Sequence, residues 1–172
     1  MVRIIIIIAI MAIGGIVSFF TVSSKDVLRY NDSMVALAGE VDGSFAGLTP
    51  FMSDYGEDKT IDITGFKTAI DHTGQVIAEK MSVLRATKVP DDQVCRTFND
   101  SLIAYVSNSQ QLQVIYAGDV FTYVSAHNPA TAGDSDAAGK FLEPLIAKDT
   151  ELLQVVKTSQ QAMATKFKMK LE

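Results

Sequence analysis

The chain has 172 residues, a formal net charge of −5 and a single cysteine. The acidic balance argues against a nucleic-acid partner, because phosphate recognition depends on clustered lysine and arginine side chains. One cysteine excludes an internal disulfide bridge, so we expect Cys95 to be a small buried hydrophobic residue. A chain of this length buries enough apolar surface to fold as one domain without a disulfide or a metal ion.

The N-terminal part is dominated by residues 4–24, a run of 21 residues without a charge. A hydrocarbon core of about 30 Å requires roughly 20 predominantly apolar residues in a helix, and the run has that length. The sequence therefore predicts a transmembrane anchor in residues 1–24 and a helical domain in residues 25–172. A secretory signal peptide is the alternative, with Arg3 as its positive region, although no Ala-x-Ala cleavage pattern ends the run.

The charges that flank the run are nearly balanced, with Arg3 on one side and Lys25 and Arg29 on the other. We expect the N-terminus inside and the domain on the outer side, periplasmic or extracellular. The reason is that three residues precede the run, whereas an acidic domain rich in small polar residues follows it. Within the run, Gly14 and Ser18 would let another transmembrane helix approach closely.

Beyond the run, apolar residues recur at alternating intervals of three and four, the spacing of amphipathic helices. The first segment continues the anchor as one rod to about Met52, and Pro50 marks its expected end region, with bending nearby. Its inward-facing positions are Val27, Asn31, Met34, Ala38, Val41, Phe45, Leu48 and Met52.

A second helix is predicted over about 61–87, with Asp58 or Thr60 as its N-cap. Its inward-facing positions are Ile63, Phe66, Ile70, Thr73, Ile77, Lys80 and Leu84. We expect Lys80 to lie at the edge of this face and to extend its ammonium group to solvent.

A third helix is predicted from Pro90 to about Ala126, because proline and acidic residues suit the first turn of a helix. Its face consists of Val94, Phe98, Leu102, Tyr105, Ser109, Leu112, Tyr116, Val120 and Tyr123. The run 128–133 contains proline and glycine and ends this helix, and Asp134 or Ser135 is the predicted cap of a fourth one.

The fourth helix contains Pro144, which removes an internal hydrogen bond. We therefore expect either a kink there or a short first piece followed by the main helix. Its predicted face consists of Phe141, Leu145, Leu152, Val155, Ser159, Ala162, Met163 and Phe167. The predicted fold is all-α: an N-terminal transmembrane helix that continues into an antiparallel up-down-up-down four-helix bundle, since short connections force neighbouring helices to alternate in direction.

That alternation places the C-terminus beside the bilayer. The candidates for contact with lipid headgroups are therefore Lys166, Phe167, Lys168 and Lys170. On an anionic membrane surface, each lysine adds about 1 kcal/mol to the binding free energy. The alternative is that these cations simply suit the negative end of a helix dipole.

Residues for catalysis or metal binding are sparse. His72 and His127 lie on different predicted helices, and neither belongs to the Glu-x-x-His pattern of bundle-type di-iron sites. No serine, cysteine or lysine lies in a recognisable nucleophile motif. We therefore expect no enzyme activity, no cofactor and no metal ion.

Aromatic residues are concentrated on the third helix, where Tyr105, Tyr116, Phe121 and Tyr123 form a candidate partner surface or line a ligand slot. The alternative is core packing, because Tyr105, Tyr116 and Tyr123 share one helix face.

The functional hypothesis is a non-enzymatic, membrane-anchored bundle that serves as an accessory or structural subunit of a membrane or cell-surface assembly. Its expected partners are the lipid bilayer and either another protein or further copies of itself. A small-ligand sensor or carrier, with its slot between the bundle helices, is the alternative.

Overall fold

The computed structural model describes residues 22–169, and all regular secondary structure in this range is helical. The elements in chain order are α1 (Val22–Phe45), η2 (Ala46–Leu48), α2 (Thr49–Gly56), α3 (Ile63–Ala86), α4 (Gln93–Ile115), η3 (Tyr116–Val120), α5 (Phe121–Ala126), α6 (Asp134–Lys140) and α7 (Glu143–Phe167). The predicted all-α class is confirmed.

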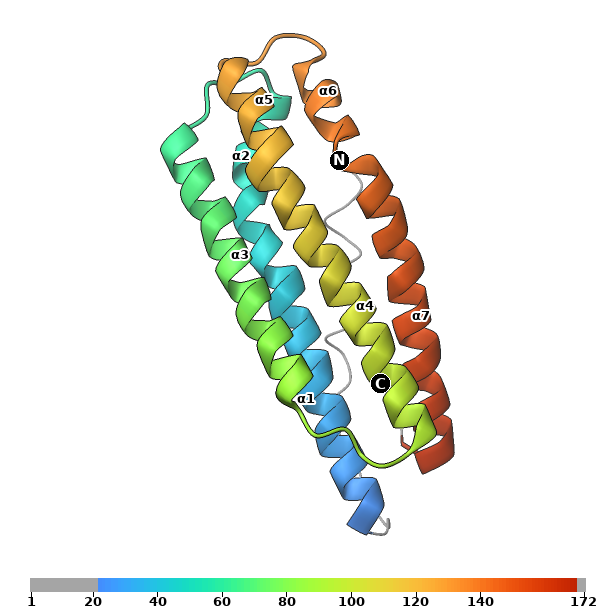
Figure 1. Ribbon diagram of the computed structural model, residues 1–172. Helices are drawn as coiled ribbons and strands as arrows, with labels where there is room; N and C mark the ends of the chain where they lie inside the picture. Colours follow the sequence, from blue (N-terminus) through green and yellow to red (C-terminus); the bar gives the residue numbers. More distant parts are fainter. Residues whose placement is uncertain (1–21, 170–172) are drawn as a thin grey trace.

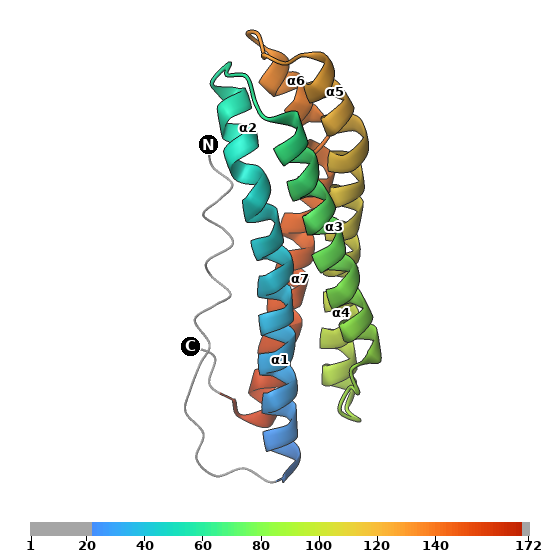
Figure 2. The ribbon, with the colours of Figure 1, turned by 90° about the vertical axis from the view of Figure 1, so that its left-hand side faces the viewer.

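The helices lie side by side in an elongated bundle (Figures 1 and 2). The rod of α1, η2 and α2 runs from one end to the other, α3 returns, the rod of α4, η3 and α5 runs forward again, and α7 returns. We call the end where α1 begins and α7 finishes the proximal end, and the end that carries α2, α5 and α6 the distal end. The central member is α4, which packs chiefly against α7 and α3, while α1 packs chiefly against α3.

The rod that begins with α1 is longer than the sequence predicts. Pro50 does not end it, because proline occupies the first turn of α2, where the missing backbone N–H is not needed. The expected irregularity takes the form of the 3₁₀ turn η2 just before it. The predicted inward face is confirmed in α1, where even Asn31 is only 1% exposed.

Helix α3 begins at Ile63 because the carboxylate of Asp62 accepts a hydrogen bond from the backbone N–H of Thr64, at 3.0 Å. The prediction of Asp58 or Thr60 as the cap is wrong. Asp58 lies in the turn that follows α2, where its backbone N–H donates to the carbonyl of Tyr55. Lys80 lies at the edge of the α3 face, as predicted, and pairs with Glu40 and Glu79.

Helix α6 is capped by Gly133, whose φ of 96° favours glycine, and not by Asp134 or Ser135. The carboxylate of Asp134 instead accepts hydrogen bonds from the backbone and hydroxyl groups of Thr131. Pro144 lies in the first turn of α7. Of the two alternatives for this proline, the structure therefore shows a short first piece, α6, followed by the main helix.

The predicted face of α7 needs correction. Val155 is 52% exposed, Phe141 is 39% exposed and Ala162 is also exposed. The residues that face the core are Leu153, Val156, Ser159, Gln160, Met163 and Ala164. The physical reason is that Gln160 is buried through a hydrogen bond to Asn31, so the inward face contains a polar residue that an apolar pattern skips.

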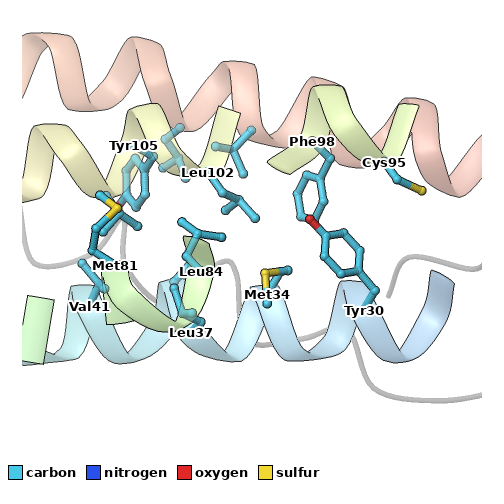
Figure 3. Close-up of a cluster of buried hydrophobic side chains, with 14 of the residues drawn as sticks. Tyr30, Met34, Leu37, Val41, Met81, Leu84, Cys95, Phe98, Leu102 and Tyr105 are labelled. Carbon is cyan, nitrogen blue, oxygen red and sulfur yellow. The ribbon is translucent and has the colours of Figure 1, made fainter. Parts of the chain in front are cut away.

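The apolar interior consists of two clusters. The larger one fills the proximal and middle part of the bundle, where Met34, Leu37 and Val41 of α1 point toward Phe98 and Leu102 of α4 (Figure 3). It includes Cys95, which is fully buried as predicted. The smaller, distal cluster contains Leu48, Tyr55, Ile61, Phe66, Ile70, Val120, Val124, Ala130, Ala138 and Leu142.

No helix in residues 22–169 is both long enough and apolar enough to cross a membrane. The predicted anchor, residues 4–24, falls almost wholly outside the described residues, and so do Gly14, Ser18 and Lys170. Residues 22–24 form the first turn of α1.

Candidate functional site

Polar side chains cross the interior of the bundle and join helices that are distant in sequence. Near the proximal end, the hydroxyl of Tyr30 donates to Asn99 at 2.9 Å, and the amide of Gln160 donates to Asn31 at 2.9 Å. A third pair, Ser101 and Ser159, shares a hydroxyl hydrogen bond of 2.8 Å. In each pair the donor and acceptor are matched, so the burial of these neutral groups is compensated.

Farther along the bundle, four residues form what we call the central cluster: Asp42 of α1, Tyr105 and Asn108 of α4, and Asp149 of α7. Asp42 is 6% exposed and Tyr105 is 4% exposed. The Tyr105 hydroxyl donates to Oδ1 of Asp42 over 2.5 Å, a short bond of the kind that a phenol forms with a carboxylate.

Burial dominates the electrostatics of Asp42. Loss of hydration raises the pKa of its carboxyl to about 6, although the hydrogen bond from Tyr105 acts in the opposite direction, and the charge of Asp149 raises the pKa further. Burial also raises the pKa of Tyr105, so its hydroxyl stays protonated and remains a donor.

Asn108 connects the cluster to α7. Its amide nitrogen donates to the backbone carbonyl of Leu145 at 3.1 Å and to Oδ1 of Asp149 at 3.2 Å. Both amide hydrogens are thereby used. The amide oxygen of Asn108 is buried and has no hydrogen-bond partner, although the residue is only 1% exposed. Burial raises the pKa of Asp149 as well, against the lowering effect of the Asn108 hydrogen bond.

There is little empty space around the cluster. A cavity of about 20 Å³ lies between α1, α4 and α7, and its lining includes Tyr105, Leu153 and Gln160. Small-molecule pockets usually have volumes of about 300–1,000 Å³. A shallow open groove of about 480 Å³ lies on the outer surface over α3 and α4, lined by Met81, Arg85 and Gln110 among others.

The predicted aromatic surface is divided by the structure. Tyr105 is in the core, whereas Tyr116, Phe121 and Tyr123 are half-buried at the distal end and pack against the distal cluster. The Tyr123 hydroxyl donates to Asp134 at 2.8 Å, and its ring stacks on His127 with centroids 4.2 Å apart. Core packing therefore accounts for Tyr105, and these aromatic residues do not form one continuous patch.

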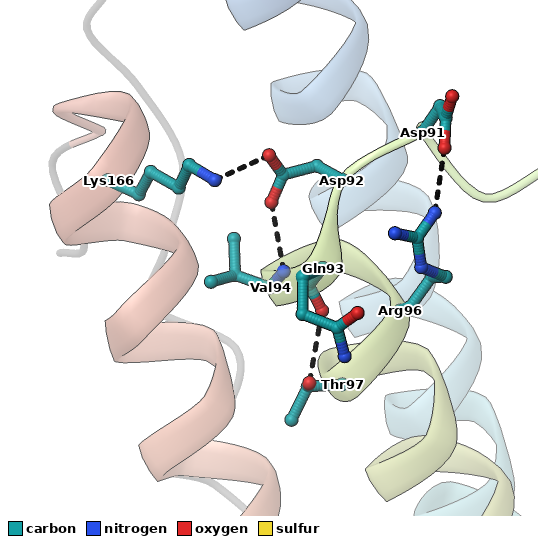
Figure 4. A network of polar contacts seen from close by, with 7 residues as sticks. All are labelled: Asp91, Asp92, Gln93, Val94, Arg96, Thr97 and Lys166. Carbon is teal, nitrogen blue, oxygen red and sulfur yellow. Dashed lines mark hydrogen bonds and ion pairs between the residues drawn. The ribbon is translucent and has the colours of Figure 1, made fainter.

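Of the predicted membrane-surface residues, Lys166, Phe167 and Lys168 lie at the proximal end, as the topology requires, and Lys170 lies outside the described residues. The ammonium group of Lys166 pairs with Asp92, the N-cap of α4, at 2.5 Å (Figure 4). Phe167 is half-buried against the proximal core, and Lys168 adopts a left-handed conformation, with a φ of 54°, that ends α7. Part of this segment therefore has a structural role within the bundle.

His72 and His127 are both exposed and lie on α3 and just after α5, respectively. In the described part of the chain, no three or more His, Cys, Asp or Glu side chains gather in a way that could hold a metal ion.

Sequence reasoning missed Asp42, Asn108 and Asp149, although a signal for each exists. Asp42 follows Ala38 by four and precedes Phe45 by three. Asn108 likewise follows Tyr105 by three and precedes Leu112 by four. Asp149 follows Leu145 by four and precedes Leu152 by three. Extending the inward faces through polar residues would have placed all three in the interior.

Comparison with known proteins adds no further identification, because no family model, curated protein or solved structure matches this chain.

Proposed function

We propose that the chain is a non-enzymatic, membrane-anchored interaction protein, an accessory or structural subunit of a membrane or cell-surface assembly. The observation that carries this proposal is the uncharged run of residues 4–24, whose last residues form the first turn of α1. The bundle then stands on the anchor with its proximal end toward the bilayer and its domain on the outer side.

The packing of the bundle supports binding through outer faces over binding of a small ligand inside. The cavity of about 20 Å³ between α1, α4 and α7 is far below the size of a ligand slot. Exposed aliphatic residues, by contrast, are present on three long helices: Val83 on α3 at 46%, Val114 on α4 at 59% and Val155 on α7 at 52% exposure. Such residues are available for contacts with a protein partner or a second copy.

Anchorage is tested by extracting membranes from expressing cells at alkaline pH. The wild-type chain should stay in the membrane pellet. The variant Ala12→Arg should shift strongly to the supernatant, because an arginine near the middle of a spanning helix costs about 2.5–3.5 kcal/mol in insertion. Ala12→Leu is the matched control and should behave as wild type. Release of the wild-type chain by alkali would rule out the anchor.

The subunit role is tested by solubilising the membranes in a mild detergent, measuring the size of the particle and identifying the proteins that co-purify. A complex of defined composition supports the proposal. A monodisperse particle containing one 18.6 kDa chain contradicts it. In that case, stabilisation of the purified chain by a small molecule would favour the ligand-carrier alternative.

A further inference from the structure

The central cluster contains more hydrogen-bond acceptors than donors. Tyr105 donates its one hydroxyl hydrogen to Asp42. Asn108 donates its two amide hydrogens to the Leu145 carbonyl and to Asp149. What remains is the acceptor capacity of two carboxylates and the unpartnered amide oxygen of Asn108. Asp42, Tyr105 and Asn108 are buried and Asp149 is half-buried, so acceptors without a donor add to the cost of burying this cluster.

The cluster also lacks a compensating positive charge. Among the described residues, no lysine, arginine or histidine forms an ion pair with Asp42 or Asp149. Lys80 of α3, a helix that packs against α1, pairs instead with Glu40 and Glu79. On α7, Lys157 is exposed and lines the small cavity beside Tyr105. The groups that face Asp42 are therefore Tyr105 from α4 and Asp149 from α7.

We propose that the central cluster is a proton-binding site, in which a proton from solvent binds to the buried carboxylate of Asp42, beside the half-buried Asp149, and tightens the packing of α4 against α1 and α7. The step forms one O–H bond and neutralises one negative charge. The new hydroxyl group supplies the donor that the cluster lacks. The inference does not depend on membrane anchorage, because all the residues involved lie within the bundle.

The direction of the pH effect follows from the raised pKa values. A carboxyl group whose pKa is about 6 in the folded chain and 3.8 in the unfolded chain binds more protons in the folded chain between these two pH values. The contribution of Asp42 to the stability of the fold therefore increases as the pH falls through 6 toward 4, and this contribution is lowest above pH 6. For Asp42 alone, the equilibrium constant for folding should be about tenfold larger at pH 5 than at pH 7.5.

The test is thermal unfolding of the full chain in a non-ionic detergent, followed by circular dichroism between pH 4.5 and 8. The wild-type Tm should be higher at pH 5 than at pH 7.5. A tenfold change in the equilibrium constant is about 1.4 kcal/mol, which corresponds to roughly 3–5 °C for a chain of this size.

The variant Asp42→Asn mimics the protonated carboxyl and adds amide donors. It should raise the Tm at pH 7.5 and flatten the profile, and Asp149→Asn should act in the same direction. Asp26→Asn, at an exposed position on the same helix, is the matched control and should keep the wild-type profile. A variant that merely disturbed packing would instead shift the Tm equally at every pH.

Two results would overturn the proposal. One is a profile of Asp42→Asn and Asp149→Asn that is as steep as that of the wild type. The other is stabilisation of the wild type, but not of Asp42→Asn, by Ca²⁺ or Mg²⁺ at pH 7.5, which would make the cluster a site for a hard cation.

Discussion

Two aspartates on neighbouring parts of the bundle, Asp42 in its middle and Asp92 at its proximal end, have opposite environments. Asp42 is buried and receives one hydrogen bond, from Tyr105, and burial raises the pKa of its carboxyl. Asp92 accepts a hydrogen bond from the Val94 backbone and pairs with Lys166, and these two partners lower the pKa of its carboxyl (Figure 4).

The difference shows that burial and the partners of a carboxylate together decide whether its charge stabilises the fold. Asp92 contributes stability that is present above pH 4 and is lost as the pH falls through its lowered pKa. Asp42 acts in the opposite sense, since its ionised form is the destabilising one. Between pH 4 and 6 the two sites can therefore be separated by titration.

The largest effect is expected when the one donor to Asp42 is removed. Tyr105→Phe leaves a buried carboxylate without its hydrogen bond, which should destabilise the chain by about 1.5–3 kcal/mol at pH 7.5. The loss should be smaller at pH 5, where Asp42 is protonated. Chemical denaturation at the two pH values measures both quantities.

Tyr30→Phe is the matched control for this prediction, because it removes a buried hydroxyl whose acceptor, Asn99, is neutral. Its cost should be about 0.5–1.5 kcal/mol and the same at both pH values. Equal pH dependence of the two variants would contradict the assignment of an ionisable acceptor to Tyr105.

A smaller effect is expected at the proximal end. Asp92→Ala removes the N-cap of α4 and should lower the Tm by a few degrees at pH 7.5, and this loss should shrink as the pH falls below 4 toward the lowered pKa of the wild-type carboxyl. Asp91→Ala is the neighbouring control, since its side chain is 100% exposed and should contribute little. A comparable loss in both variants would argue against a specific cap.

The smallest effect is expected for Lys166→Ala. The lysine side chain is 49% exposed, and exposed ion pairs contribute little after solvent screening. The change in Tm should be close to the limit of detection and should vanish at 1 M salt. A loss as large as that of Asp92→Ala would show that the pair, and not the cap, accounts for the role of Asp92.

Much of the helical fold could be predicted from sequence, because the periodicity of α1, α3 and α4 is carried by apolar residues such as Met34, Ile70 and Phe98. The face of α7 was predicted less well. Its inward positions include Gln160, whose burial depends on Asn31, 129 residues away. Local spacing contains no information about such a partner.

The same argument applies to the central cluster. The spacing of Asp42 is that of an inward position, but its hydrogen-bond donor, Tyr105, is 63 residues away and is not identified by that spacing. The capping residues were missed for a different reason. Several acidic or hydroxyl residues precede α3, and only the backbone conformation selects Asp62 from among them.

The burial of Cys95 has a practical consequence for mapping the orientation of the chain. Its thiol is enclosed in the proximal core, and burial raises its pKa, so the reactive thiolate is scarce at neutral pH. The native protein should therefore react very slowly with membrane-impermeant maleimides. Labelling in intact cells of a cysteine introduced at an exposed position, such as Glu151 on α7, would test the proposal that the bundle lies on the outer side of a membrane, with no need to remove the native thiol first.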